Sequence, residues 1–109
     1  MKTLFVAIIA MFFSVSVLAQ DPQPSSNRLL CAVAEGDAPH VVEFRKAGMT
    51  KDDVYYLIDN WPTEEWKRNM SKISVEIIYG VDMDTLSSYD AQNIKTAVYR
   101  TCMILLEGK

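Results

Sequence analysis

Two cysteines, Cys31 and Cys102, are the feature that most constrains how this chain of 109 residues can fold. They lie far apart in the sequence, and no third cysteine is present. In an oxidising compartment, two cysteines in a small domain usually form a disulfide. Closing a loop of about 70 residues stabilises a fold by about 4 kcal/mol in the chain-entropy model. Catalytic dithiols typically stand close together as C-x-x-C, so a structural disulfide is favoured over a redox pair.

The first 19 residues, MKTLFVAIIAMFFSVSVLA, predict export. Lys2 precedes a short apolar core, and small residues stand before an expected cleavage site after Ala19, as in a secretory signal peptide. The apolar core is shorter than the roughly 20 residues that a membrane span needs, so a membrane anchor is the less favoured reading. We therefore expect a periplasmic or secreted protein with no stable membrane insertion once residues 1–19 are removed.

The expected mature chain, residues 20–109, has a length that supports one domain with a modest core. It carries 10 basic and 14 acidic residues, a net charge of −4. Nucleic-acid binding rewards clustered Lys and Arg, so we expect no nucleic-acid partner. The oligomeric state stays open.

Polar and proline-rich residues 20–27 predict a flexible lead, and residues 28–109 predict a single helical domain. Pro39 should kink or split the first helix, with Asp37 capping the second piece. Gly48 suits the left-handed position after the helix end. The apolar positions that recur at helical spacing in this segment are Leu30, Val33, Ala34, Val41 and Phe44.

Thr50 and Asp53 resemble a capping box that begins the next helix, and Pro62 ends it. Its expected buried face consists of Val54, Leu57, Ile58 and Trp61. Thr63 is the expected cap of the third helix. The expected buried stripe of that helix consists of Trp66, Met70, Ile73, Ile77 and Val81.

Ser87 or Ser88 should begin the last helix. Its apolar stripe is Ala91, Ile94, Val98, Cys102 and Leu105, which directs Cys102 into the core. No β-hairpin signal and no internal repeat are present in the sequence. The fold class predicted is therefore all-α: a small bundle of four to five short helices held by one Cys31–Cys102 disulfide.

Three short sequence motifs provide the evidence for a family resemblance. Cys31 is followed by VVEFRKAGMT, which contains Arg45 and Gly48, and later by AVYRTC, which contains Tyr99 and Cys102. This order resembles a group of small exported bacterial and phage proteins of unassigned function, which have a cysteine on the first helix, an ARxxG segment and a terminal YxxC. The resemblance implies a helical fold with a disulfide and implies no activity.

His40 is the only histidine, so a small hydrolase would have to depend on it. No serine lies in a nucleophile-elbow sequence. The carboxylate pairs Asp52–Asp53 and Glu64–Glu65 fall at helix starts, where the helix dipole explains them. We therefore predict that the chain is not an enzyme, and keep a hydrolase using His40 as the alternative of another class.

The segment DMDTLSSYD raises the question of calcium, with side-chain oxygens at Asp82, Asp84 and Asp90. An EF-hand loop has Gly at its sixth position and Glu at its twelfth. Here those positions are Ser87 and Asn93. We interpret the segment as an acidic turn between helices and expect neither a metal site nor a cofactor.

Five residues are candidates for partner binding: Tyr55, Tyr56, Trp61, Trp66 and Arg45. Tyr and Trp are enriched at binding hot spots, but they also fill small cores, and the sequence leaves both readings open. Tyr56 is the one expected to face outward. Arg45 is either a charge at a helix end or a partner contact.

The sequence therefore predicts a small exported non-catalytic binding protein that acts on a protein partner, for example as an inhibitor or an immunity-type factor. The alternative within binding is a periplasmic acid-stress chaperone of the HdeA type, which is also small, helical and single-disulfide. The cysteine spacing here is longer than in that family.

Overall fold

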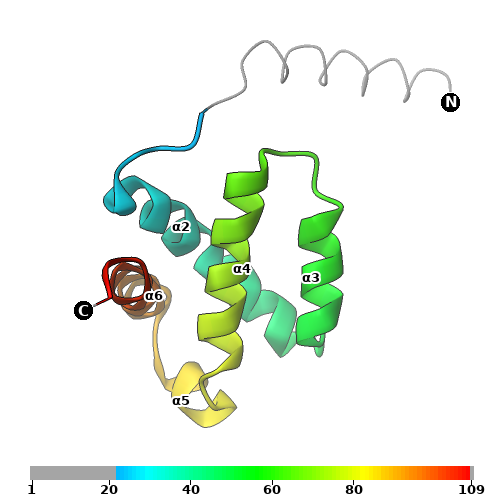
Figure 1. Ribbon diagram of the computed structural model, residues 1–109. Coiled ribbons are helices and arrows are strands. Elements are labelled where there is room, and N and C mark those ends of the chain that lie inside the picture. Colours follow the sequence, from blue (N-terminus) through cyan, green and yellow to red (C-terminus); the bar gives the residue numbers. More distant parts are fainter. Residues whose placement is uncertain (1–21, 109) are drawn as a thin grey trace, which may run out of the picture.

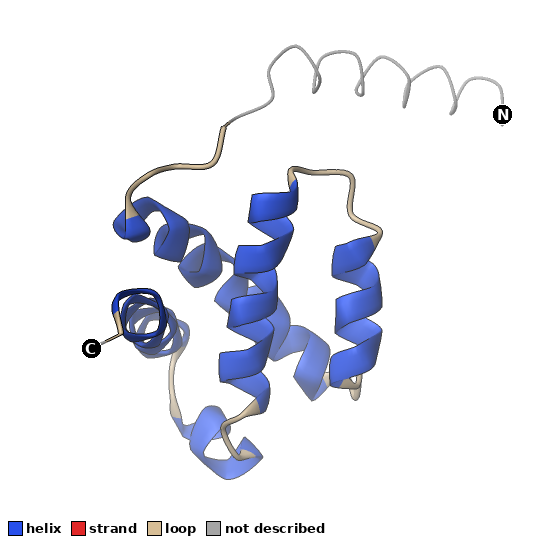
Figure 2. Ribbon diagram, viewed as in Figure 1, coloured by secondary structure: helices blue, strands red, loops and turns tan. Residues whose placement is uncertain are grey.

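The computed structural model describes residues 22–108, and within that range the chain is an all-α bundle without strands (Figure 2). The predicted signal peptide, residues 1–19, lies outside the described residues. Residues 22–26 are non-helical, which agrees in position with most of the predicted lead. The helices are α2 (Asn27–Lys46), α3 (Lys51–Asp59), α4 (Glu65–Tyr79), α5 (Met83–Ser88) and α6 (Ala91–Glu107). The predicted fold class is confirmed.

The longest helix, α2, is the element around which the others pack. It contacts α4 and α6 extensively and α3 only slightly, whereas α3 packs mainly on α4. Figure 1 shows α3 and α4 as neighbouring ribbons, with α2 crossing behind α4. One cluster of buried side chains joins these helices: Leu30, Cys31, Ala34, Ala38, Val41, Val42, Val54, Ile58, Met70, Val75, Ile78, Leu86, Ile94, Val98 and Cys102.

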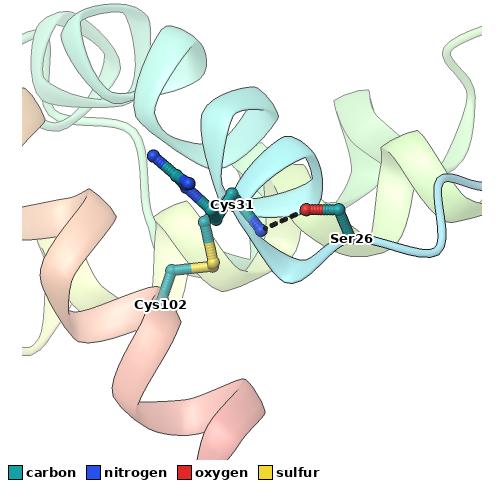
Figure 3. The surroundings of a disulfide bond; sticks show 4 residues. Ser26, Cys31 and Cys102 are labelled. Atoms are coloured by element: carbon teal, nitrogen blue, oxygen red, sulfur yellow. Dashed lines mark hydrogen bonds between the residues drawn. A yellow bond between two sulfur atoms is a disulfide. The ribbon is translucent and has the colours of Figure 1, made fainter.

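The disulfide joins α2 to α6 (Figure 3). The Cα atoms of Cys31 and Cys102 lie 5.6 Å apart, and both side chains are fully buried. One turn before Cys31, the Ser26 hydroxyl accepts a hydrogen bond from the Arg28 backbone N–H and caps the start of α2. The predicted disulfide is thus placed inside the core at a helix–helix contact.

Pro39 lies inside α2 without dividing it, so the expected split of the first helix is wrong. Proline removes one backbone hydrogen bond and clashes with the preceding turn, at a cost of about 3 kcal/mol in an exposed helix. The flanking residues Ala38, Val41 and Val42 are buried against neighbouring helices, and this packing offsets the cost. Asp37 consequently caps nothing, and its carboxylate contacts Ser71 on α4 instead.

The helix between residues 50 and 60 begins as predicted. The Thr50 hydroxyl accepts from the Asp53 N–H, and the Asp53 carboxylate accepts from the Thr50 N–H, which completes a capping box. Gly48 has φ 91°, the left-handed conformation that glycine adopts at little steric cost. The turn between α2 and α3 is therefore specified locally.

Two other predicted helix starts are wrong. Glu64, not Thr63, holds the N-cap position of α4, and the Thr63 hydroxyl donates to the Glu64 carboxylate. Ser87 and Ser88 belong to α5, and Asp90 caps α6 by accepting from the Asn93 N–H. An aspartate competes well with serine for such a position because its charged oxygen also interacts with the helix dipole.

The predicted apolar stripes contain the buried residues of most helices but also include several residues that are exposed. Val54, Ile58, Met70, Ile94, Val98 and Cys102 are buried, as expected. Leu57, Trp61 and Leu105 are exposed, as is Ala91. On α4, the buried set includes Ser71, Ser74 and Val75, while Trp66, Ile73, Ile77 and Val81 are only partly buried. A bundle this small covers only a narrow strip of each helix.

Replacing both cysteines, Cys31→Ser with Cys102→Ser, should lower the melting temperature by more than about 10 °C. The bond closes a loop of 71 residues and so restricts mainly the unfolded chain, while the helices keep their packing. Circular dichroism should show a retained helical spectrum and an earlier thermal transition. An unchanged melting temperature would show that packing alone holds α2 to α6.

Candidate functional site

An open groove of about 370 Å³ runs between α2 and α3. Four of its lining residues belong to α2, three to α3, one to the turn after α3 and one to α4. They are Asp37, His40, Val41, Phe44, Val54, Leu57, Ile58, Trp61 and Ser71. The groove exists because α3 packs mainly on α4 and touches α2 little. Its volume lies within the range typical of ligand sites in proteins.

The walls of this groove are apolar and open to solvent. Leu57 is 46% exposed and Trp61 is 42% exposed, although both have large apolar side chains. Phe44 faces them from α2 and is half-buried. Exposed apolar residues are ordinary when they are scattered singly; here two of them lie along one groove, which makes this groove a candidate binding surface.

One end of the groove is polar. The Ser71 hydroxyl lies 2.5 Å from the Asp37 carboxylate, to which it donates, and 3.1 Å from the Lys67 carbonyl, an alternative acceptor. Burial raises the pKa of Asp37 above its ordinary value, and the Ser71 hydrogen bond and the nearby His40 oppose this shift without cancelling it. Among the described residues, Ser71 is the only hydrogen-bond donor to this carboxylate.

Asp37, His40 and Ser71 thus lie in one groove, yet they are not arranged as a catalytic triad. A triad places the imidazole between the serine and the carboxylate. Here the serine donates directly to the carboxylate, and Ser71 is almost fully buried. The arrangement holds a carboxylate at the groove end and does not activate a hydroxyl for attack.

Tyr55, a predicted binding residue, is tied to α4 instead of being presented to solvent. Its hydroxyl donates to the Glu76 carboxylate, which also pairs with Lys51 at 2.8 Å. Lys72 lies 5.4 Å from the centre of the Tyr55 ring and pairs with Asp59. Burial, followed by the hydrogen bond to Glu76, raises the pKa of Tyr55 to about 12. The hydrogen bonds from Lys51 and Tyr55 lower the pKa of Glu76.

The other aromatic candidates separate into two environments. Tyr56 is 69% exposed and lies beside Leu57 on α3, so its predicted outward orientation is confirmed. Trp61 lines the groove. Trp66 lies on α4, packs partly against the core and has Lys67 5.5 Å from its ring centre. Tyr56 and Trp61 are therefore exposed, and Tyr55 and Trp66 make contacts within the chain.

Arg45 acts within the fold. Its guanidinium donates to the backbone carbonyls of Ile78, in the last turn of α4, and Val81, in the turn that follows, and lies 5.3 Å from the centre of the Tyr79 ring. The Tyr79 hydroxyl donates to the Met49 carbonyl at 2.7 Å. A cation at the carbonyl end of a helix satisfies unpaired acceptors and complements the helix dipole. Of the two readings left open by the sequence, these contacts match the charge at a helix end.

The acidic turn that suggested calcium has a local structural role. Asp82 caps α5 by accepting from the Thr85 N–H and hydroxyl, and these bonds lower its pKa. Asp90 caps α6. Among residues 22–108, no group of three acidic, histidine or cysteine side chains is placed to hold a metal ion.

Of the nine lining residues, only His40 and Trp61 are candidate site residues in the sequence analysis. The polar pair Asp37 and Ser71 comes from two helices that are far apart in the sequence, so no local motif joins them. Among the described residues, no helix is both long and apolar enough to cross a membrane. Comparison with protein-family models, curated proteins and solved structures finds no match.

Arg45→Met should lower the free energy of unfolding by about 2 kcal/mol, because it removes a charged donor from two helix-end carbonyls. Arg45→Lys should recover only part of this loss, since a lysine cannot reproduce the planar guanidinium. Arg100→Met, at an exposed position of α6, is the matched control and should change stability by less than about 0.5 kcal/mol. Urea unfolding measures all three. Equal losses in the Arg45→Met and Arg100→Met variants would contradict the capping role.

Asp37→Asn should raise stability more at pH 7 than at pH 3.5 relative to the wild type. A carboxyl whose folded pKa is raised binds more protons folded than unfolded. The wild type therefore carries the full cost of this charge above the folded pKa and loses the cost below the unfolded value, 3.8. The amide removes the titration and can still accept from Ser71. Urea unfolding of both proteins at the two pH values measures the difference, and a constant difference would contradict the assignment.

Proposed function

We propose that this chain is a small exported, non-catalytic binding protein that docks a protein partner on the exposed face of α3 and in the groove beside it. The observation that carries the proposal is the groove lined by the exposed side chains Leu57 and Trp61. Tyr56 precedes Leu57 on α3 and is exposed. An exposed tyrosine and tryptophan beside a concave apolar strip match the composition of binding hot spots.

Export is part of the proposal and has two supports. The first is the signal-like sequence of residues 1–19. The second is the disulfide between α2 and α6, a bond that persists mainly in oxidising compartments such as the periplasm or the extracellular space. We place the protein in the periplasm or outside the cell.

An inhibitor or an immunity-type factor fits this surface, since such proteins act by occupying a partner. The direct Ser71–Asp37 hydrogen bond gives no support to a hydrolase built on His40. That alternative and the acid-stress chaperone remain predictions from the sequence.

A photoreactive amino acid at position 56 should form a covalent adduct with the partner in the native compartment, and one at position 89 should not. Tyr89 is the matched control because it is also an exposed tyrosine, at 48% against 69% for Tyr56, and it lies at the end of α5 instead of on α3. With the partner identified and purified, Tyr56→Ala should weaken binding about 30-fold, the effect of losing a hot-spot residue.

The stability of the Tyr56→Ala protein should stay within about 0.5 kcal/mol of the wild type, as for other surface changes. Adducts from position 89 but not from position 56 would place the binding surface elsewhere. An unchanged affinity in Tyr56→Ala together with Leu57→Ala would refute docking on α3.

A further inference from the structure

We propose that the groove takes the apolar face of an amphipathic partner helix and that a lysine or arginine of this helix pairs with Asp37. The inference rests on the proposed function and names the chemistry of the occupant at the same site. It follows from the shape of the groove, from the charges that line it and from the position of the Asp37 carboxylate.

The shape of the groove suits a helix. One wall is a helical row on α2, from Asp37 to Phe44, and the other is Val54 to Ile58 on α3, continued by Trp61 in the turn that follows. The α2 row covers two helical turns, a length of about 10 Å. An occupant that presents one apolar side chain per turn matches this length, as in other complexes where a helix lies in a groove.

The charges in and beside the groove favour a cationic side chain on the partner helix. Asp37 is the only carboxylate among the lining residues, neither lysine nor arginine is among them, and His40 is the other titratable side chain there. Glu43 lies one turn from His40 on α2, and Asp53 lies one turn from Leu57 on α3; both side chains are exposed. An acidic partner helix would meet like charge along this groove, whereas a basic one is complementary.

Three basic side chains of the neighbouring helices are engaged elsewhere. Lys51 pairs with Glu76, Lys72 pairs with Asp59, and Arg45 donates to the end of α4. His40, which also lines the groove, acts on Asp37 through its charge alone, so Ser71 is the one hydrogen-bond donor to this carboxylate among the described residues.

Covering Asp37 with a purely apolar surface would be unfavourable. The carboxylate is already partly desolvated, which is why its pKa is raised. Removing the remaining water without a new partner adds to that cost. A cationic side chain at the end of an apolar face offsets it, and so Asp37 sets both the register and the charge of the occupant.

The test uses two synthetic peptides of about 18 residues, five helical turns, with leucine at the same positions. One carries lysine and the other glutamate at the remaining positions. The protein is the disulfide-bonded chain with Trp66→Phe. Because the sequence has two tryptophans, Trp61 in the groove is then the only tryptophan that reports binding by fluorescence. Titrations are done at about 0.15 M salt, which screens distant charges.

The lysine peptide should bind at least about tenfold more tightly than the glutamate peptide. Asp37→Asn should weaken its binding about tenfold, and Asp52→Asn, at an exposed position of α3 away from the groove, should weaken it less than twofold. Leu57→Ala should also weaken binding. Leu105→Ala is its matched control, since Leu105 is 60% exposed on α6.

Four results would overturn the inference. The first is equal, Leu57-dependent affinity for both peptides, which means that the groove docks helices without selecting a cation. The second is an equal effect of Asp37→Asn and Asp52→Asn, which means general attraction. The third is self-association that Leu57→Ala abolishes, measured by sedimentation, which makes a second copy the occupant. The fourth is binding of neither peptide. The proposed function survives the first, second and fourth results if position 56 still forms partner adducts.

Discussion

The disulfide between α2 and α6 is the constraint on which the packing of the other helices depends. It links the first and last helices of the described chain at a fully buried contact. α3, α4 and α5 then lie within one closed loop, whose unfolded form has fewer conformations to lose on folding. A domain of this length has a modest core, so this reduction in unfolded-state entropy is a large part of its net stability.

Because α2 is held against both α6 and α4, it tolerates a residue that would break a free helix. Pro39 is flanked by buried positions, and the packing of these neighbours keeps the helix continuous. Near its C-terminal end, Arg45 donates to one carbonyl in the last turn of α4 and to one in the turn after it. The disulfide and the Arg45 contacts thus fix α2 at two points, near its start and near its end. α3 has only its contact with α4 and a slight one with α2.

Local chemistry made part of this fold predictable. The capping box of Thr50 and Asp53, the left-handed Gly48 and the cysteine pair are short-range or compositional signals, and the structure confirms each. The helix starts at Glu64 and Asp90 were missed because several polar residues compete for a cap, and tertiary packing decides between them. The spacing of apolar residues alone also predicts that the whole apolar face of every amphipathic helix is buried.

The groove could not be predicted from the sequence either, because it also depends on tertiary packing. Leu57 and Trp61 fit the buried stripe of α3, and their exposure results from how far α3 stands from α2. The sequence pattern predicts Asp37 to be a helix cap. Its hydrogen bond with Ser71, 34 positions away, depends on tertiary packing and leaves no local signal in the sequence. Of the predicted binding residues, Tyr56 was recognisable since its position opposite Val54 and Ile58 follows from helix geometry alone.

Asp37 gives a physical reason why the groove is open at all. Moving α3 onto α2 would bury Leu57, Trp61 and Phe44, a favourable change at about 25 cal/mol per Å² of apolar surface. The same movement would remove the remaining water from a carboxylate whose hydrogen-bond donor is Ser71 and whose pKa burial already raises. This desolvation cost opposes closure by the protein's own helices. In the complex proposed above, a cation from the partner would offset that cost, so the residue that opposes closure would also select the occupant.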